Sequence, residues 1–311
     1  MPPGCAPVAG TPHAGTIPLM STPGSSTTGD ARARVGALLV ELGVTQPLQS
    51  VSDLGARLGV VQGVLADRIL DLAVTESGRR RLWAEVRGRR WAEERGIGVP
   101  EVLAAADDGR WLLSRRVRPG PAGGDRWTEE AIDAAVRMAP LPAPPGEPWR
   151  PPQGAALRRA RASVQDAGRL VRGGVPIGEL RAIRAAARQL PQAEVGHGDL
   201  RAANAVLDEE LGRLVVLEWA GVETGPRHRD LLTLWATTAM DEDRARIADV
   251  VLERTAGWEE PEVGLHWHAV ALEQLVARIT RPDRGDGLDT AFERARLVEA
   301  RRMARELGSP F

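Results

Sequence analysis

Apolar residues recur at helical spacing in two stretches of the first third of the chain. After Asp30, a favourable N-cap residue, valine and leucine side chains follow one another every three or four positions as far as Gly43. This pattern predicts a short amphipathic helix. Residues 79–95 repeat the pattern, with leucine, valine and tryptophan set among charged residues, and end at Gly96. They predict a second helix.

Short apolar runs separated by turn residues predict strands on both sides of this second helix. Residues 48–75 hold two or three such runs, punctuated by glycines, and the segment Arg68–Thr75 has the length of a strand. Two more strands are expected at 99–103 and 110–117, around the turn at Asp107-Asp-Gly109. Residues 30–117 are therefore predicted to form an α+β unit, the N-lobe.

The rest of the chain, residues 118–311, is predicted to be a mainly helical C-lobe. Residues 118–152 are rich in proline and glycine, which is typical of connections around one helix. A strand-rich interruption at 205–218 predicts a buried hairpin. The apolar spacing predicts six further helices, at 155–172, 177–189, 229–240, 242–255, 263–280 and 289–307.

Composition limits the class of protein. Apolar residues make up 43% of the 311 residues and charged residues 27%, which is typical of globular chains, whereas residues 1–29 are rich in Pro, Gly, Ser and Thr and predict a disordered tail. The 41 basic and 42 acidic residues leave a net charge of −1, so nucleic acid is not expected as a partner. No apolar run reaches the length of a membrane span, and the one cysteine has no partner, so we expect a cytoplasmic protein without membrane contact.

Every basic side chain apart from the five histidines is arginine, because the sequence contains no lysine. A mechanism that needs an amine nucleophile or a phosphate-binding lysine must therefore do without one. The pair His266-Trp-His268 is not expected to form a metal clamp, because residues two apart on a helix point to different faces. Surface or capping positions are predicted for both histidines.

One segment combines residues that suit phosphoryl transfer. Asp199 is followed five residues later by Asn204, then by the predicted hairpin, and then by Glu218. A hydroxyl that attacks a γ-phosphate needs an oriented carboxylate to accept its proton, and the phosphates need Mg²⁺ held by hard oxygen donors. The spacing matches how kinase-fold phosphotransferases arrange a base and two metal ligands around ATP.

This segment resembles the aminoglycoside phosphotransferase and choline kinase-like family. The family signature HGDxxxxN appears as His197-Gly-Asp199 to Asn204, its later acidic step as Leu217-Glu-Trp219, and its following aspartate as Asp230. The resemblance implies a bilobal, protein-kinase-like α+β fold, with a small, degenerate, strand-containing N-lobe and a mainly helical C-lobe. ATP and Mg²⁺ are then expected between the lobes.

The resemblance also implies roles for single residues. Asp199 becomes the catalytic base, Asn204 and Glu218 the Mg²⁺ ligands, and His197 and Asp230 structural supports of the loop. Glu85 lies where the family has a cofactor-site helix glutamate that pairs with a strand lysine.

Three features depart from the family pattern. The strand before Glu85 offers Asp71 or Ala73 where a lysine is expected, so the phosphate grip must come from an arginine or be absent. Glu218 replaces the usual aspartate and is one methylene longer, which matters because Mg²⁺ demands near-ideal geometry. Arg201, two residues after the base, offers a cation within reach of the transferring phosphoryl group that partly replaces the missing lysine.

The sequence predicts an ATP-dependent phosphotransferase that acts on a hydroxyl of a peptide Ser/Thr or of a small metabolite, in natural-product biosynthesis. One alternative is an aminoglycoside-type antibiotic resistance kinase. Another is a catalytically silent, pseudokinase-like subunit that binds a protein partner. The absent lysine and Glu218 favour the silent subunit, while Asp199, Asn204 and Arg201 favour the enzyme.

Overall fold

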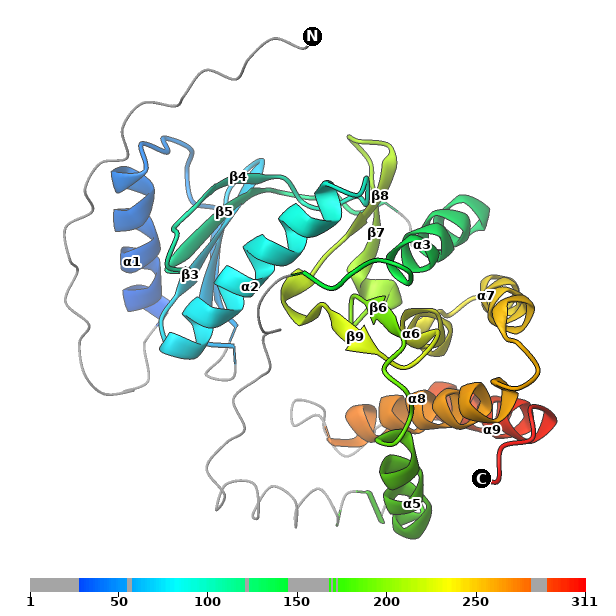
Figure 1. Ribbon diagram of the computed structural model, residues 1–311. Helices are drawn as coiled ribbons and strands as arrows, with labels where there is room; N and C mark the ends of the chain where they lie inside the picture. Colours follow the sequence, from blue (N-terminus) through cyan, green and yellow to red (C-terminus); the bar gives the residue numbers. More distant parts are fainter. Residues whose placement is uncertain are drawn as a thin grey trace, which may run out of the picture.

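A small antiparallel sheet with two helices stands beside a mainly helical region in the computed structural model (Figure 1). This architecture confirms the predicted α+β, kinase-like fold. The structure describes residues 28–54, 58–120, 123–144, 168, 170–171, 173–280 and 290–311. Residues 1–27 of the tail expected at 1–29 lie outside these residues, as does most of the helix expected at 155–172. Residues 28–29 begin a helix, so the predicted disorder is wrong for these two.

The N-terminal sheet has five strands in the order β1-β2-β3-β5-β4, and every neighbouring pair is antiparallel. On the central strand β3, Asp71 lies opposite Gln62 of β2 and Leu112 of β5. The strands are β1 (Ser50–Asp53), β2 (Val60–Val64), β3 (Arg68–Ala73), β4 (Val102–Ala105) and β5 (Trp111–Arg115).

One helix covers each face of this sheet. Helix α1 (Thr28–Glu41) packs Val35 and its neighbouring leucines against one face, where Gly63 of β2 leaves room for the Val35 side chain. Helix α2 (Glu76–Glu93) packs Leu82 against the other face. Side chains of a strand alternate between its two faces, so Asp71 and the residues two positions away from it on β3 face α2.

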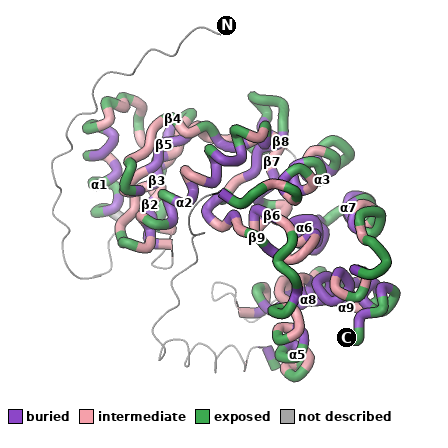
Figure 2. Tube along the Cα trace, in the orientation of Figure 1, coloured by how far each residue is buried: buried purple, intermediate pink, exposed green. Residues whose placement is uncertain are grey.

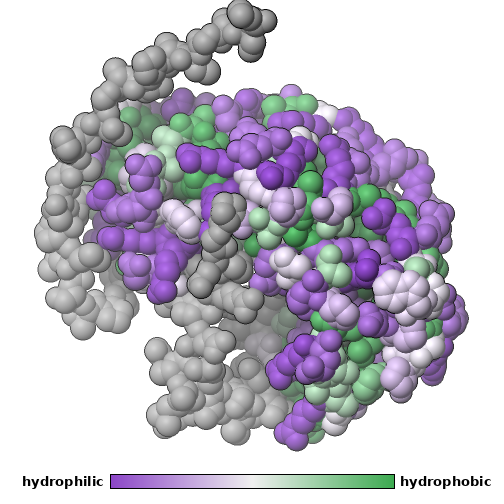
Figure 3. Space-filling view, viewed as in Figure 1, coloured by the Kyte–Doolittle hydropathy of each residue, from purple (hydrophilic) through white to green (hydrophobic). Residues whose placement is uncertain are grey.

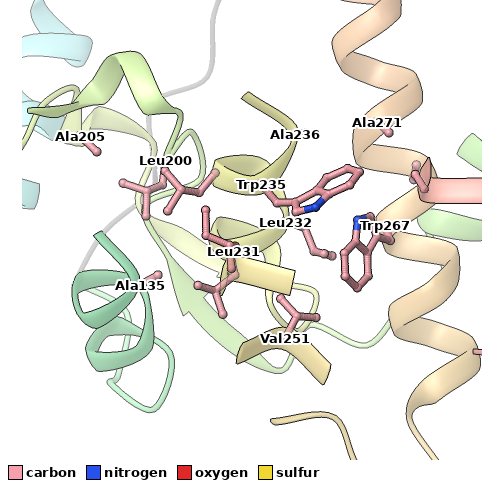
Figure 4. Close-up of a cluster of buried hydrophobic side chains, with 14 of the residues drawn as sticks. Ala135, Leu200, Ala205, Leu231, Leu232, Trp235, Ala236, Val251, Trp267 and Ala271 are labelled. Atoms are coloured by element: carbon pink, nitrogen blue, oxygen red, sulfur yellow. The ribbon is translucent and has the colours of Figure 1, made fainter. Parts of the chain in front are cut away.

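The helical region contains α3 (Asp125–Met138), α5 (Ile177–Ala187), α6 (Arg229–Thr237), α7 (Asp241–Arg254), α8 (Glu260–Thr280) and α9 (Ala291–Glu306). The positions of α5 to α9 confirm the five helices predicted after residue 176 to within a few residues, and α3 is the one helix expected within residues 118–152. Helices α6 and α8 are the most deeply buried of these (Figure 2), and Trp235 and Trp267 meet edge to face between them, with ring centroids 5.3 Å apart (Figure 4). No helix in the described residues has the length and apolar character to cross a membrane.

Two strand pairs interrupt the helices. The predicted hairpin is confirmed as β7 (Ala205–Asp208) and β8 (Arg213–Val216). The second pair, β6 (Glu194–Gly196) with β9 (Glu223–Gly225), was not predicted. Strands of three residues are too short to show an alternating pattern, and their pairing depends on the tertiary fold.

The segment after β5 is fastened to the β7–β8 hairpin. The Gly120 N–H donates to the Leu207 carbonyl at 2.8 Å, and the Glu209 N–H donates to the Arg118 carbonyl at 3.0 Å. The Glu210 carboxylate at the hairpin tip pairs with both Arg115 and Arg118. The connection between sheet and helices is therefore held by backbone pairing.

His266 and His268 are buried in α8, so the predicted surface or capping positions are wrong. Helix α8 packs against α5, α6 and α9 and so buries several of its faces, including both that carry these rings. The His266 Nδ1–H donates to the Arg227 carbonyl at 3.1 Å. Burial, with the nearby charges of Arg229 and His228, lowers the pKa of His266 from 6.5 to about 4.

One face of the molecule is largely polar. On the face shown in Figure 3, hydrophilic residues predominate and hydrophobic residues form smaller groups between them. This distribution is ordinary for a folded domain, because the surface of a soluble protein always retains apolar atoms.

We expect the stability of the protein to fall in mild acid because of His266. Below pH 6.5 His266 is protonated in the unfolded chain, whereas in the folded chain it stays neutral until the pH approaches its pKa of about 4. The contribution of neutral His266 to the free energy of unfolding is therefore complete above pH 6.5 and is lost as the pH falls towards 4. The total is about 3 kcal/mol. Urea unfolding from pH 7.5 to 4.5 should show a shallower pH dependence in His266→Gln, and equal slopes in the two proteins would contradict the prediction.

Candidate functional site

The loop at residues 197–204, between β6 and β7, is held by a single buried carboxylate. Asp230, in the first turn of α6, accepts the His197 N–H at 2.6 Å and the Gly198 N–H at 3.1 Å. Gly198 has φ +85°, and a Cβ there would lie 2.7 Å from the Gly221 carbonyl oxygen. The loop therefore needs both the carboxylate and the glycine to keep its path.

His197 is fully buried and supports the loop from beneath. Its ring meets Trp219 edge to face, with centroids 4.9 Å apart and planes at 86°. Its Nδ1 accepts the Asp199 N–H at 3.3 Å. Farther along, the Ala202 N–H donates to Thr237 Oγ1 of α6 at 3.0 Å. These contacts hold the backbone on both sides of the Asp199 side chain.

Three predicted site residues meet within this loop. The Asp199 carboxylate is 44% exposed, and its Oδ2 accepts a hydrogen bond from Arg201 Nη2 at 2.5 Å. Asn204 Nδ2 donates to the Asp199 carbonyl at 2.9 Å and lies 3.4 Å from Oδ2. Since the amide nitrogen of Asn204 is occupied in this way, its amide oxygen is the atom available to a ligand.

Glu218 follows β8 and comes next to this loop through the hairpin. The Leu217 N–H donates to the Asn204 carbonyl at 2.8 Å. Glu218 itself has φ 66° and ψ 54°, a left-handed conformation that costs a side-chain-bearing residue about 1 kcal/mol or more. Its side chain is 52% exposed. Such strain is typical of functional positions.

Glu85 lies deeper, where α2 contacts the segment after Glu218. Its Oε1 accepts Arg89 Nε at 2.8 Å, and its Oε2 accepts the Ala220 N–H at 2.9 Å. Burial alone raises the pKa of Glu85, but the charges of Arg89 and Arg81 and these hydrogen bonds outweigh it, so the net pKa is lowered. The structure thus joins Glu85 to Arg89 and to the backbone beside Glu218.

Sequence reasoning missed Arg81, and it named Asp71 only as a residue at the position where a lysine is expected. Arg81 of α2 places Nη2 3.3 Å from Glu218 Oε2. Asp71 of β3 is buried and accepts a hydrogen bond from Gln62 Nε2 at 2.9 Å, and burial raises the pKa of Asp71. The four-residue spacing of Arg81, Glu85 and Arg89 was the available signal, because residues so spaced share one face of a helix.

The donor set suits Mg²⁺ in combination with a ligand. Asn204 offers an amide oxygen and Glu218 a half-exposed carboxylate, and both are the hard oxygen donors that Mg²⁺ prefers. No group of three or more His, Cys, Asp or Glu suited to a metal ion occurs in the described part of the chain. Two protein donors leave room for phosphate oxygens and water, which is how Mg²⁺ is usually held in phosphate-binding sites.

Comparisons with known proteins match the greater part of the chain to one family. The sequence profile of the phosphotransferase enzyme family matches residues 60–266, a range that includes every residue of the site. A search of curated proteins found no significant match.

Three solved structures with a similar fold are named as kinases or phosphotransferases, or as members of a kinase family. A choline/ethanolamine kinase family protein from Mesorhizobium loti has a TM-score of 0.53 and 17% identity, with 90% of this chain and 98% of that chain covered. A choline kinase from Streptococcus pneumoniae has a TM-score of 0.52 and 10% identity, with coverages of 88% and 99%. The GDP complex of an aminoglycoside 2'-phosphotransferase has a TM-score of 0.52 and 12% identity, with coverages of 88% and 97%.

Proposed function

Because the chain belongs to the phosphotransferase enzyme family, we propose that it transfers the γ-phosphoryl group of ATP to a hydroxyl of its substrate. The observation that carries the proposal is that Asn204 contacts Asp199 within one loop, while the hydrogen bond from the Leu217 N–H to the Asn204 carbonyl brings the end of the hairpin, with Glu218, beside that loop. A carboxylate beside two oxygen donors for a metal is the minimum that this chemistry requires. The GDP complex of a structural neighbour supports a nucleotide as the phosphate donor.

In the proposed reaction, Asp199 accepts the proton of the substrate hydroxyl as its oxygen attacks the γ-phosphorus and the bond to ADP breaks. Asn204 and Glu218 are the residues that would hold Mg²⁺, which when bound neutralises phosphate charge. Arg201 contributes a fixed positive charge beside the base, where the transferring phosphoryl group passes. His197, Asp230 and Glu85 act as positioning residues through the loop and the backbone next to Glu218.

The charges around Asp199 bear on the acceptor. Arg201 pairs with the Asp199 carboxylate, and Arg229 donates to the Gly198 carbonyl at 3.2 Å and to Glu223 at 3.0 Å. Because the carboxylates of Asp199 and Glu223 are already paired with these arginines, this part of the site offers little free negative charge to a polycationic acceptor. We therefore propose a hydroxyl of a peptide Ser/Thr or of an uncharged small metabolite, in natural-product biosynthesis in the cytoplasm, over an aminoglycoside.

A second function is favoured by one observation. Both Asp199 and Glu218 are paired with arginines, and the chain has no lysine. A catalytically silent subunit that binds a nucleotide or a partner protein would have this arrangement if the arginines stood permanently in place of the metal. The tests below separate it from the enzyme.

We expect the acceptor to be found among peptides and uncharged metabolites. Each candidate is incubated with the protein, ATP and Mg²⁺, and a transferred phosphoryl group appears by mass spectrometry as a gain of about 80 daltons. A gain on an aminoglycoside panel alone would reverse the proposed acceptor class. Absence of transfer to any acceptor, with nucleotide binding intact, would favour the silent subunit.

Replacing the proposed base should abolish turnover while the fold remains. Asp199→Asn keeps the size of the side chain but removes the proton acceptor, so we expect the rate to fall by about 10² to 10⁴. Thermal unfolding confirms that the variant folds, and Asp249→Asn, an exposed position on α7, is the matched control. Full turnover in Asp199→Asn would refute the assignment.

Glu218 should be required for metal-dependent nucleotide binding. Calorimetry with Mg·ATP should show a loss of affinity in Glu218→Ala, because one of two oxygen donors is removed. Glu218→Asp, which keeps the carboxylate, should bind Mg·ATP as well as the wild type or better. Identical Mg·ATP affinity in the wild type and Glu218→Ala would contradict a role in metal binding.

A further inference from the structure

The face of the sheet that meets α2 carries an acid at its centre in place of a cation. Asp71 occupies the middle of β3, is buried, and is paired with Gln62 of the neighbouring strand. The chain has no lysine, so a cation for the nucleotide phosphates must come from an arginine of another element. Burial raises the pKa of the Asp71 carboxyl, and the positive charges of Arg89 and Arg81 oppose this rise, so these are arginines close to it.

Helix α2 supplies these arginines from one face. Arg81, Glu85 and Arg89 are spaced by four residues and are all buried. Arg89, one turn after Glu85, is bound to the Glu85 carboxylate at 2.8 Å. Arg81, two turns nearer the N-terminus of the helix, reaches Glu218 instead.

The pair between Arg81 and Glu218 is poorly explained by stability alone. The Arg81 side chain is 8% exposed, whereas that of Glu218 is 52% exposed. A carboxylate so open to water contributes at most about 1 kcal/mol to an ion pair, while a buried guanidinium loses much of its hydration. The arrangement holds a guanidinium rigidly at the edge of the site, beside a proposed metal ligand.

We propose that Arg81 grips the nucleotide phosphates in place of a strand lysine. This inference rests on the proposed function. In the chain without nucleotide, the Arg81 guanidinium is held by Glu218, and on binding it exchanges this carboxylate for phosphate oxygens. A guanidinium suits this exchange because its planar fork donates two parallel hydrogen bonds to either a carboxylate or a phosphate.

Calorimetry with ATP and with adenosine, each with and without Mg²⁺, tests the inference. Arg81→Met keeps the apolar stem and removes the charge, and we expect about 10- to 100-fold weaker ATP binding, the effect of one charged hydrogen-bonding group. Adenosine binding should change less than about twofold, because adenosine carries no phosphate. Arg81→Lys should restore part of the ATP affinity. Arg80→Met, an exposed arginine on the same helix, is the matched control and should bind as the wild type does.

The outcomes separate this inference from the proposed function. Folded Arg81→Met that binds ATP as the wild type does would overturn the role of Arg81 and leave the phosphotransferase proposal intact. An equal loss for ATP and adenosine would also overturn it, because it would indicate a structural role. If the wild type bound no nucleotide, the proposed function itself would fail. Should Arg81→Met not fold, Arg81→Gln takes its place under the same criteria.

Discussion

The site depends on the ion pair and the hydrogen bonds made by one buried carboxylate, that of Glu85. Glu85 lies on α2, which packs on the N-terminal sheet, and its carboxylate accepts a hydrogen bond from the Ala220 N–H in the helical region. One side chain therefore joins the two parts of the molecule. Burial of this charge is tolerated because Arg89 pairs with it and because both of its oxygens accept hydrogen bonds. Removing the partner of this carboxylate would leave an unpaired buried charge and would destabilise the fold by about 3–5 kcal/mol.

The position of Glu218 follows from that anchor. Gly88, one turn after Glu85, lets α2 approach so closely that a Cβ there would lie 2.4 Å from the Trp219 carbonyl oxygen. Trp219 in turn packs edge to face on His197, which accepts the Asp199 N–H. A continuous set of packed and hydrogen-bonded groups therefore runs from the sheet helix to the proposed base. Rigid placement of this kind is what phosphoryl transfer needs, because its catalysis is mainly positioning and electrostatics.

The positive charges of the site come from arginines on other elements and not from a lysine on the sheet. An aspartate stands on β3, and the cations come from α2 and from the loop at 197–204. Each of the two exposed carboxylates, Asp199 and Glu218, thus has an arginine within hydrogen-bonding or ion-pairing distance. Because a guanidinium stays charged at all physiological pH values, this arrangement does not depend on a tuned amine pKa.

Elements with local signals could be predicted from the sequence alone. Helical spacing predicted α2 and α5 to α9, alternation and a turn predicted the β7–β8 hairpin, and the motif from His197 to Asp230 predicted the fold and brought forward the residues of the loop. The β6–β9 pairing depends on the tertiary structure, because three-residue strands carry no periodic signal. So does the burial of His266 and His268, because α8 is enclosed by helices from distant parts of the chain. The tertiary structure also decided which of the many arginines reaches the site. On an isolated helix, Arg81 looks like any charge on a solvated face, and the packing of α2 against the turn at Glu218 brings that charge to the site.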